Sequence, residues 1–197
     1  RKQGISVISA PGRNAEAVAD LTVGYITMLS RGILKSIDFI RNGGELGEST
    51  FEGRQFFGHE LGANTLGLIG FGQVGYRVAV RVKAFGMSVL VYDPFVDKEK
   101  AKRLGVTMVD DLDELLAKAD FVSLHLRASA ENENFMDRDK ILKIKQGAFL
   151  INSARETLVN EQDLYEALLS GHLAGAALDV VRPRQDRSPN PLLSLDN

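Results

Sequence analysis

The stretch of sequence that decides the fold is residues 65–75, which read TLGLIGFGQVG. Five mostly apolar residues come first, and glycines follow at positions 70, 72 and 75. Helical periodicity begins inside the same stretch, because apolar residues recur at intervals of four, four and three at Val74, Val78, Val82 and Phe85. This order predicts a buried strand, a tight glycine turn and an amphipathic helix.

Outward from this stretch, short apolar runs recur along the chain. They are Thr65–Ile69, Ser88–Tyr92, Val106–Val109, Phe121–Leu124, Ala148–Ile151 and Gly175–Leu178. Helical patterns separate the runs, and near-continuous apolarity is typical of parallel strands that are covered on both faces. We therefore predict an α/β fold, a doubly wound parallel sheet of six main strands, over roughly residues 60–180.

Capping signals define two of the intervening helices. A pair of aspartates precedes the leucines of residues 112–116, and Asn160 precedes a second periodic segment. Aspartate and asparagine side chains accept hydrogen bonds from the free amides of a helix start. Gly171 follows the second segment, where a helix end needs positive φ. Helices are therefore expected over both segments.

The pattern before residue 60 is different. Ile5–Ser9 is a possible strand, Arg41–Phe57 is rich in glycine and charge and predicts an irregular connection, and 182–191 predicts another. Between them, Asn14 is the expected cap of a helix. Its apolar residues are Val18, Leu21, Tyr25 and Leu29.

Composition excludes several classes of protein. The net charge is −2 and no basic run exceeds two residues, which argues against nucleic-acid binding. The longest uncharged segment has 16 residues, shorter than the about 20 of a membrane span. No cysteine is present, which excludes disulfides and zinc–thiolate sites and fits a reducing compartment. We expect a cytoplasmic protein without a metal, because no signal-peptide pattern opens the chain. Since residue 1 is Arg rather than Met, we also expect the sequence to be a piece of a longer protein.

The glycine spacing has two interpretations. In one, Gly70 permits the tight turn, Gly72 lets the backbone approach a pyrophosphate, and Gly75 allows close packing of helix on strand. The amides of Gln73 and Val74 then face the anion at the helix start. In the other interpretation, the turn only packs a helix on a strand.

Asp93 favours the dinucleotide interpretation. It ends the next apolar run, eighteen residues after Gly75. A carboxylate at this position accepts hydrogen bonds from the ribose diol of an adenosine and repels a 2′-phosphate. No cation follows until Lys98. The expected cofactor is therefore NAD rather than NADP.

Further motifs resemble those of the NAD-dependent D-isomer-specific 2-hydroxyacid dehydrogenases, a family that includes phosphoglycerate dehydrogenase. The resemblance covers nearly the whole chain. Besides the glycine loop, it is carried by Pro11–Asn14, Phe85–Met87, Tyr92–Pro94, Leu112–Leu116, Leu124–Leu126, Asn152–Arg155 and Leu173–Val180.

The resemblance implies a domain arrangement. Residues 13–184 would form a Rossmann NAD-binding domain, with residues 1–12 a remnant of a split substrate (catalytic) domain and residues 185–197 the start of the return to it. It also implies a homodimer, to which the Asn14–Ser30 helix contributes, and a small 2-hydroxy or 2-keto acid as substrate.

Arg155 is the expected catalytic residue. It follows an apolar run, at the carboxyl end where ligands of such sheets bind. The resemblance assigns it to the substrate carboxylate, which a guanidinium can hold through two parallel hydrogen bonds. The same resemblance gives Asp179 to the nicotinamide carboxamide and sets Leu126, Ser153 and Ala154 beside the nicotinamide or its ribose, with Arg155 also near the cofactor. Packing in the hydrophobic core would explain Leu126, Ser153 and Ala154 equally well.

The sequence departs from the family pattern at the acid–base pair. The family's His, oriented by an acidic side chain, would lie beyond Asn197, and none of His59, His125 and His172 matches it. The acid position holds Arg184, which cannot accept a hydrogen bond from an imidazole, although Gln185 could if the loop shifts by one residue.

Arg127 is a second departure, because the family usually has Pro there. Either Arg127 and Arg184 make a cationic pocket for a substrate with extra anionic groups, or both point to solvent. Two functions follow from these alternatives. The first is an enzyme that transfers a hydride between NAD(H) and a 2-hydroxy acid, and the second is an NAD-responsive regulatory protein without catalysis.

Overall fold

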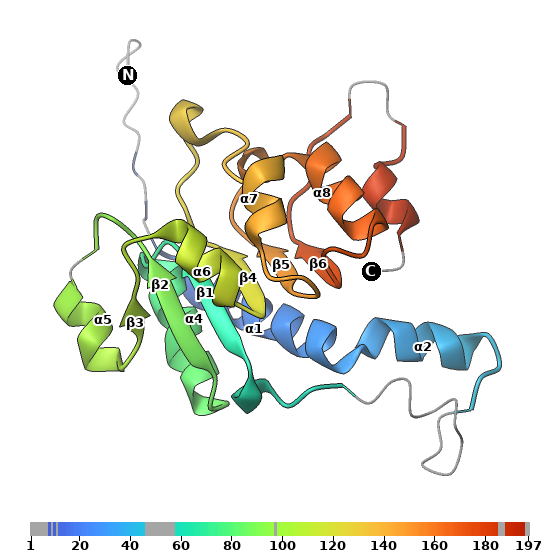
Figure 1. Cartoon of the computed structure of the whole chain (residues 1–197), viewed down its shortest axis with the longest axis horizontal. Coiled ribbons are helices and arrows are strands. Elements are labelled where there is room, and N and C mark those ends of the chain that lie inside the picture. The colour runs from blue at the N-terminus through green and yellow to red at the C-terminus, as the bar shows by residue number, and fades with distance from the viewer. Residues whose placement is uncertain are drawn as a thin grey trace.

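The structure, a computed structural model, describes residues 8, 10, 12–45, 58–96, 98–184 and 188–195. Its centre is one parallel sheet with strand order β3-β2-β1-β4-β5-β6 (Figure 1). The strands are β1 (Thr65–Ile69), β2 (Ser88–Tyr92), β3 (Thr107–Met108), β4 (Phe121–Leu124), β5 (Phe149–Asn152) and β6 (Gly175–Leu178). All six predicted strands are confirmed; the third is shorter than expected and the fifth begins and ends one residue later.

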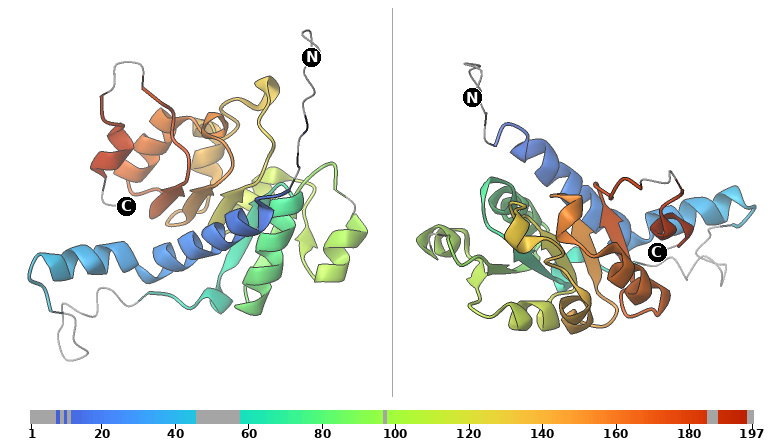
Figure 2. Two further views of the ribbon diagram at one scale, coloured as in Figure 1. Left: turned by 180° about the vertical axis from the view of Figure 1, so that it is seen from behind. Right: turned by 90° about the horizontal axis from the view of Figure 1, so that it is seen from above.

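Helices cover both faces of this sheet (Figures 1 and 2). The α-helices are α1 (Ala15–Arg31), α2 (Ile33–Arg41), α4 (Gln73–Ala84), α5 (Lys98–Leu104), α6 (Leu112–Lys118), α7 (Arg138–Lys143) and α8 (Glu161–Leu169). The short 3-10 helices are η1 (Leu61–Ala63), η2 (Ala130–Asn132), η3 (Glu156–Leu158) and η4 (Pro191–Ser194). Sequence patterns did not predict α2, α5 and α7, because these helices bury few apolar residues.

Two hydrophobic cores form, one on each side of the sheet. One core packs α1, α4 and α5 on one face, and the other packs α6, α7 and α8 on the opposite face. Gly67 of β1 shows how close this packing is, because a Cβ added there would lie 2.5 Å from Leu115 Cδ2. Strands β1, β4 and β5 are almost completely buried, which explains their continuous apolarity, whereas β2, β3 and β6 are less buried. The doubly wound prediction is confirmed.

The predicted capping signals are confirmed for α6 and α8. The Asp111 carboxylate accepts a hydrogen bond from the amide of Asp113, and the Asn160 side chain accepts from Gln162 and Asp163. Gly171 has φ +71°, as expected after a helix end. Asn14 precedes α1 as predicted but makes no side-chain capping bond.

The buried face of α1 differs from the prediction. Four small side chains and one large one face the core there: Ala15, Ala19, Thr22 and Ser30, together with Ile26. The expected apolar stripe of Val18, Leu21, Tyr25 and Leu29 is only half-buried or exposed. The helix packs tightly against α4, and small residues permit the close approach. The larger apolar side chains are therefore left at the edge of the contact.

Helix α2 extends away from the rest of the domain (Figure 2). It has no buried residue, and Leu34 and Ile40 are 58% and 52% exposed. No single helix among the described residues has the length and apolarity to cross a membrane, and only α1 and α2 together, bent by 60°, pass that test by length and composition.

The predicted strand at Ile5–Ser9 and most of the segments 1–12 and 41–57 lie outside the described residues. After β6 the chain passes through 188–195, where the Asn190 side chain donates to Glu161 Oε2 of α8 at 2.8 Å. This segment returns to the domain surface by packing Leu192 and Leu195 against the α8 side of the core.

Candidate functional site

The candidate site lies along the carboxyl edge of the sheet and has two ends. The glycine-loop end consists of Gly70–Gly75 and Asp93, at the ends of β1 and β2. The pocket end is a cavity of about 380 Å³ beside the ends of β4, β5 and β6. Its lining comprises Asn14, Val18, Val74, His125, Leu126, Arg127, Ala128, Ser153, Ala154, Arg155, Asp179 and Val180. Val74 belongs to both ends, so the two are continuous.

The three glycines have distinct surroundings. Gly70 has φ +98°, and an added Cβ would lie 2.7 Å from the carbonyl oxygen of His125. At Gly75 the added Cβ would lie 2.3 Å from the Gly70 carbonyl oxygen, so the packing of α4 on β1 excludes any side chain. Gly72 has no atom within 4 Å of an added Cβ and faces open space. This is the arrangement that a bound pyrophosphate requires.

The start of α4 leaves its first amides available. Gly72 is the N-cap residue and no side chain caps the helix there. Gln73 and Val74 occupy the first two helical positions, where amides point outward along the helix axis. Anions bind at such helix starts because the amides donate and the helix dipole is positive.

Asp93 is held against the glycine loop. Its Oδ2 accepts a hydrogen bond from the Phe71 amide at 2.7 Å, and its Oδ1 accepts from the Phe95 amide at 2.9 Å. A carboxylate has about four lone-pair sites, so both oxygens retain capacity for a ribose diol. The nearest lysines are engaged elsewhere: Lys98 pairs with Asp110 at 2.9 Å, and Lys100 lies 4.4 Å over the Tyr76 ring.

Arg155 is exposed in the pocket and its turn is fixed by Asn152. The buried Asn152 side chain donates to the Arg155 carbonyl at 2.8 Å and accepts from the Ala154 amide at 3.1 Å. Arg155 Nη1 donates to the Ala154 carbonyl at 2.6 Å, which leaves the rest of the guanidinium facing the cavity. Sequence analysis did not assign Asn152 a role; an asparagine two residues before a turn amide is the signal that could have found it.

Asp179 and Ser153 are brought together by strand pairing. Asn152 of β5 is in register with Leu178 of β6, and the Asp179 amide donates to the Asn152 carbonyl at 3.0 Å. The residues directly after both strands therefore lie side by side. Helix α1 approaches the same place: the Ser153 and Thr22 hydroxyl oxygens are 2.9 Å apart, and burial together with the Asp179 charge raises the pKa of Tyr25.

Of the three histidines of the chain, only His125 lines the pocket. Burial lowers the pKa of His125 to about 4, and its Nε2 lies 3.0 Å from the Ser123 hydroxyl. Its imidazole is therefore neutral at pH 7 and a weak base. His172 Nε2 contacts the Ile141 carbonyl of α7, and His59 lies in a separate cavity at the opposite edge, beside residues that precede β1 and β4.

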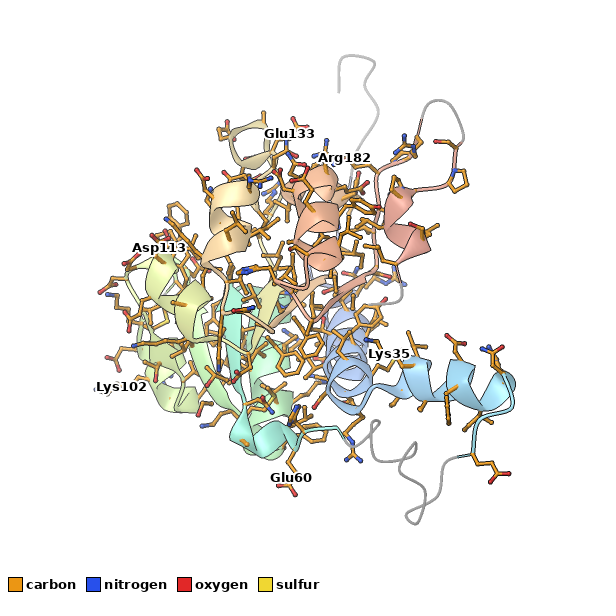
Figure 3. The ribbon with its side chains drawn as sticks, turned by 45° about the vertical axis from the view of Figure 1, so that its right-hand side comes forward. Lys35, Glu60, Lys102, Asp113, Glu133 and Arg182 are labelled. Carbon is orange, nitrogen blue, oxygen red and sulfur yellow. The ribbon has the colours of Figure 1, made fainter. Side chains whose placement is uncertain are left out.

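The two arginines predicted to form a cationic pocket have different environments, and Arg184 is not among the residues that line the cavity. Arg127 is exposed and lines the pocket. Arg184 Nε donates to Ser188 Oγ at 2.7 Å, within its own segment. Arg182, for which no sequence motif predicted a role, joins the segment after β6 to two other loops (Figure 3): its guanidinium bonds Glu133, the Asn134 side chain and the Thr157 carbonyl.

The glycine loop, the open helix start and the fixed carboxylate fit a bound dinucleotide. Residues 23–197 match the family described as D-isomer specific 2-hydroxyacid dehydrogenase, NAD binding domain. This chain belongs to that family. NAD is its cofactor, and the family resemblance seen in the sequence motifs is confirmed.

Two relatives and one solved structure illustrate the similarity. D-3-phosphoglycerate dehydrogenase of Methanocaldococcus jannaschii is 39% identical over 196 residues, all of this chain and 36% of the relative. Hydroxypyruvate reductase of Thermotoga maritima is 38% identical over all of this chain and 62% of its own length. The crystal structure of D-lactate dehydrogenase from Aquifex aeolicus with NAD and lactic acid superposes with a TM-score of 0.82 at 34% identity, covering 92% of this chain and 52% of that one. The chain thus spans between about a third and three fifths of these proteins.

Proposed function

We propose that this chain is the cofactor-binding part of an enzyme that transfers a hydride between a 2-hydroxy acid and NAD(H). The observation that carries the proposal is Arg155, an exposed residue just after β5 that lines a cavity together with Asp179. The Asn152 side chain fixes this turn by donating to the backbone carbonyl of Arg155. A planar guanidinium matches the carboxylate that every 2-hydroxy acid carries beside its reacting carbon. The similar proteins named above are dehydrogenases and reductases of small hydroxy or keto acids.

The proposal assigns the cofactor to both ends of the site. Gly72 leaves room for the pyrophosphate, Gly70 forms the turn, Gly75 allows α4 to pack closely on β1, and the amides of Gln73 and Val74 donate to the pyrophosphate. Asp93 accepts from the adenosine ribose, which favours NADH over NADPH because a 2′-phosphate would meet this carboxylate. Equal or tighter binding of NADPH in a fluorescence titration would contradict that preference.

The pocket end would hold the reacting part of the cofactor. Asp179 and Ser153 accept from the nicotinamide carboxamide, while Leu126 and Ala154 line the ring or its ribose. The bound nicotinamide supplies the hydride acceptor or donor. Arg155 holds the substrate carboxylate so that the carbon bearing the hydroxyl faces that ring, which removes most of the cost of orientation.

Oxidation of a hydroxy acid also releases the hydroxyl proton, which needs an acceptor. His125 is unsuited because of its low pKa, and His59 and His172 lie away from the pocket. We assign the proton carrier to residues outside these 197. The domain limits 1–12, 13–184 and 185–197 and the cytoplasmic location belong to the same proposal.

The assay that tests this proposal uses NADH oxidation with a panel of millimolar 2-keto acids. A full-length protein should show saturable turnover with at least one acid. The 197-residue chain alone should bind NADH without turnover, because none of its three histidines is suited to carry the proton at the pocket end. Saturable turnover by the chain alone would mean that one of its own three histidines carries the proton. Absence of turnover in the full-length protein would favour an NAD-responsive regulatory role.

A homodimer is part of the proposal. Its support is α2, whose apolar side chains Leu34 and Ile40 are exposed on a helix that extends from the domain. Exposed apolar surface of this kind commonly marks a protein interface. Light scattering after size exclusion should give a dimer mass, and Leu34→Glu with Ile40→Glu should shift it to the monomer. A monomer mass for the unmodified protein would reject the dimer.

A further inference from the structure

Helix α1 contacts the pocket end through one buried pair of hydroxyl groups. Thr22 is fully buried, and Ser153 is 6% exposed and lines the pocket. Their oxygens are 2.9 Å apart, although the two residues are separated by 131 positions in the sequence. Thr22 Oγ1 also lies 2.8 Å from the Val18 carbonyl oxygen, one turn earlier in the helix.

These two distances fix which group donates in each contact. A carbonyl oxygen cannot donate, so the proton between Thr22 and Val18 belongs to Thr22. A threonine hydroxyl has one proton, which leaves Thr22 only able to accept from Ser153. The Ser153 proton therefore points at Thr22, away from the cavity. If Thr22 instead donated to Ser153, its oxygen would face the Val18 carbonyl at 2.8 Å with no proton between them.

The free lone pairs of Ser153 are consequently what this side chain offers to a ligand. Asp179, beside it at the end of β6, offers a carboxylate, which is also an acceptor. A group bound between Ser153 and Asp179 forms the most hydrogen bonds if it carries two N–H donors. A carboxamide has them, whereas a carboxylate of the same shape has only acceptors.

We propose that Thr22 is a positioning residue that makes Ser153 an obligatory hydrogen-bond acceptor, and thereby favours a carboxamide-bearing cofactor over its carboxylate analogue. This inference rests on the proposed function, because it takes the nicotinamide to bind at the pocket end. Arg127 and Arg155 line the same cavity and attract any carboxylate. The effect of Thr22 is therefore measured as a change in preference rather than as the preference itself.

The test compares two ligands by isothermal titration calorimetry: NADH and reduced nicotinic acid adenine dinucleotide, in which a carboxylate replaces the carboxamide. The quantity of interest is the Kd of the acid form divided by the Kd of NADH. In Thr22→Val, the Ser153 hydroxyl is free to turn its proton into the cavity. The ratio should then fall by about fivefold, the size of one hydrogen bond between neutral groups.

Thr27 provides a matched control on the same helix. Its hydroxyl donates to the Val23 carbonyl at 2.9 Å, as that of Thr22 does to Val18, but it does not line the pocket. Thr27→Val should leave the ratio unchanged, and Thr22→Ser, which retains the hydroxyl, should restore it. A purely structural role of Thr22 would lower the melting temperature of Thr22→Val without changing the ratio.

The outcomes separate this inference from the proposed function. A ratio in Thr22→Val within twofold of that in Thr27→Val overturns the inference. If Thr22→Val does not fold, Ser153→Ala replaces it and should lower the ratio by a similar factor; an unchanged ratio there is equally contrary. Failure to bind NADH refutes both proposals, whereas NADH binding without turnover of any acid refutes only the enzyme and leaves the inference standing.

Discussion

The glycine-loop end and the pocket end of the site are built in different ways. At the glycine-loop end most contacts are made by backbone atoms: Gly75 packs against the Gly70 carbonyl, and the Phe71 amide donates to the Asp93 carboxylate, the one side chain involved. At the pocket end the contacts are made by side chains, which come from α1 and from the residues that follow β4, β5 and β6. The first end is therefore specified by a short local sequence, and the second depends on how distant segments pack.

The largest effect expected from this difference is at Gly75. Gly75→Ala adds a methyl group 2.3 Å from the Gly70 carbonyl oxygen, which α4 can avoid only by moving off β1. We expect a loss of about 2–3 kcal/mol in the free energy of unfolding, despite the better helix propensity of alanine. NADH affinity should fall by about 100-fold or more, because the loop geometry is lost.

Gly72→Ala is the control, because its Cβ would meet no atom within 4 Å and its φ of −72° suits alanine. It should cost about 1 kcal/mol or less as an N-cap change, but it should weaken NADH binding about tenfold by filling the space of the pyrophosphate. Urea denaturation and NADH titration measure both quantities. Normal NADH binding by Gly75→Ala would show that the glycine-loop end does not depend on the close backbone contact between Gly75 and Gly70, and would remove this difference from the pocket end.

The next effect concerns Arg155. Arg155→Lys in the full-length protein keeps the charge but loses the two parallel hydrogen bonds to a carboxylate. We expect kcat/KM for the best 2-keto acid to fall by roughly 100-fold, while the Kd of NADH changes less than twofold. Arg103→Lys on the exposed face of α5 is the control and should behave as wild type. A kcat/KM near normal in Arg155→Lys would remove this residue from the substrate site.

His125, which adjoins both ends, gives a pH effect of intermediate size. Its pKa is about 4 in the folded chain and about 6.5 when exposed, so the unfolded state binds more protons between these values. Stability is therefore complete above about pH 6.5 and decreases as the pH falls toward 4. Between pH 7.5 and 5 the contribution of His125 should be a loss of about 2 kcal/mol.

Urea denaturation at the two pH values, with His125→Gln as the comparison, measures this contribution. The variant cannot titrate there, so its stability should decrease less over the same range. A proton-NMR titration that gave His125 a pKa near 6.5 in the folded chain would contradict the burial of its ring against Ser123.

The smallest effect is expected from the ion pairs between α1 and α4. Arg81 pairs with Asp20 and Glu16, both well exposed, and such pairs contribute little. Asp20→Asn should change the melting temperature by less than about 2 °C, and less again at high salt. A larger change would mean that ion pairs, rather than buried side chains, hold α1 against α4. The position of Thr22 on α1 would then depend on those ion pairs.

Sequence alone determined the sheet and the glycine-loop end. The six apolar runs predicted every strand, since strands buried on both faces must be apolar along their whole length. Gly70, Gly72 and Gly75 were predicted with their neighbours, because their geometry depends mainly on backbone conformation within one strand–turn–helix unit, and Asp93 directly follows the next strand of the chain. The motifs also gave the family, which similarity over residues 23–197 confirmed.

Tertiary structure alone decided the pocket end and the surface of α1. Periodicity predicted the helix but not its buried face, because close packing on α4 buries mainly small residues, with Ile26 as the large exception, and leaves the predicted stripe at the edge of the contact. The roles of Asn152 and Thr22 depend on hydrogen bonds whose partners are fixed only when β5 is in register with β6 and α1 crosses their ends. The direction of such a bond depends on the positions of three oxygens from two segments far apart in sequence, and a local pattern carries no information about that arrangement.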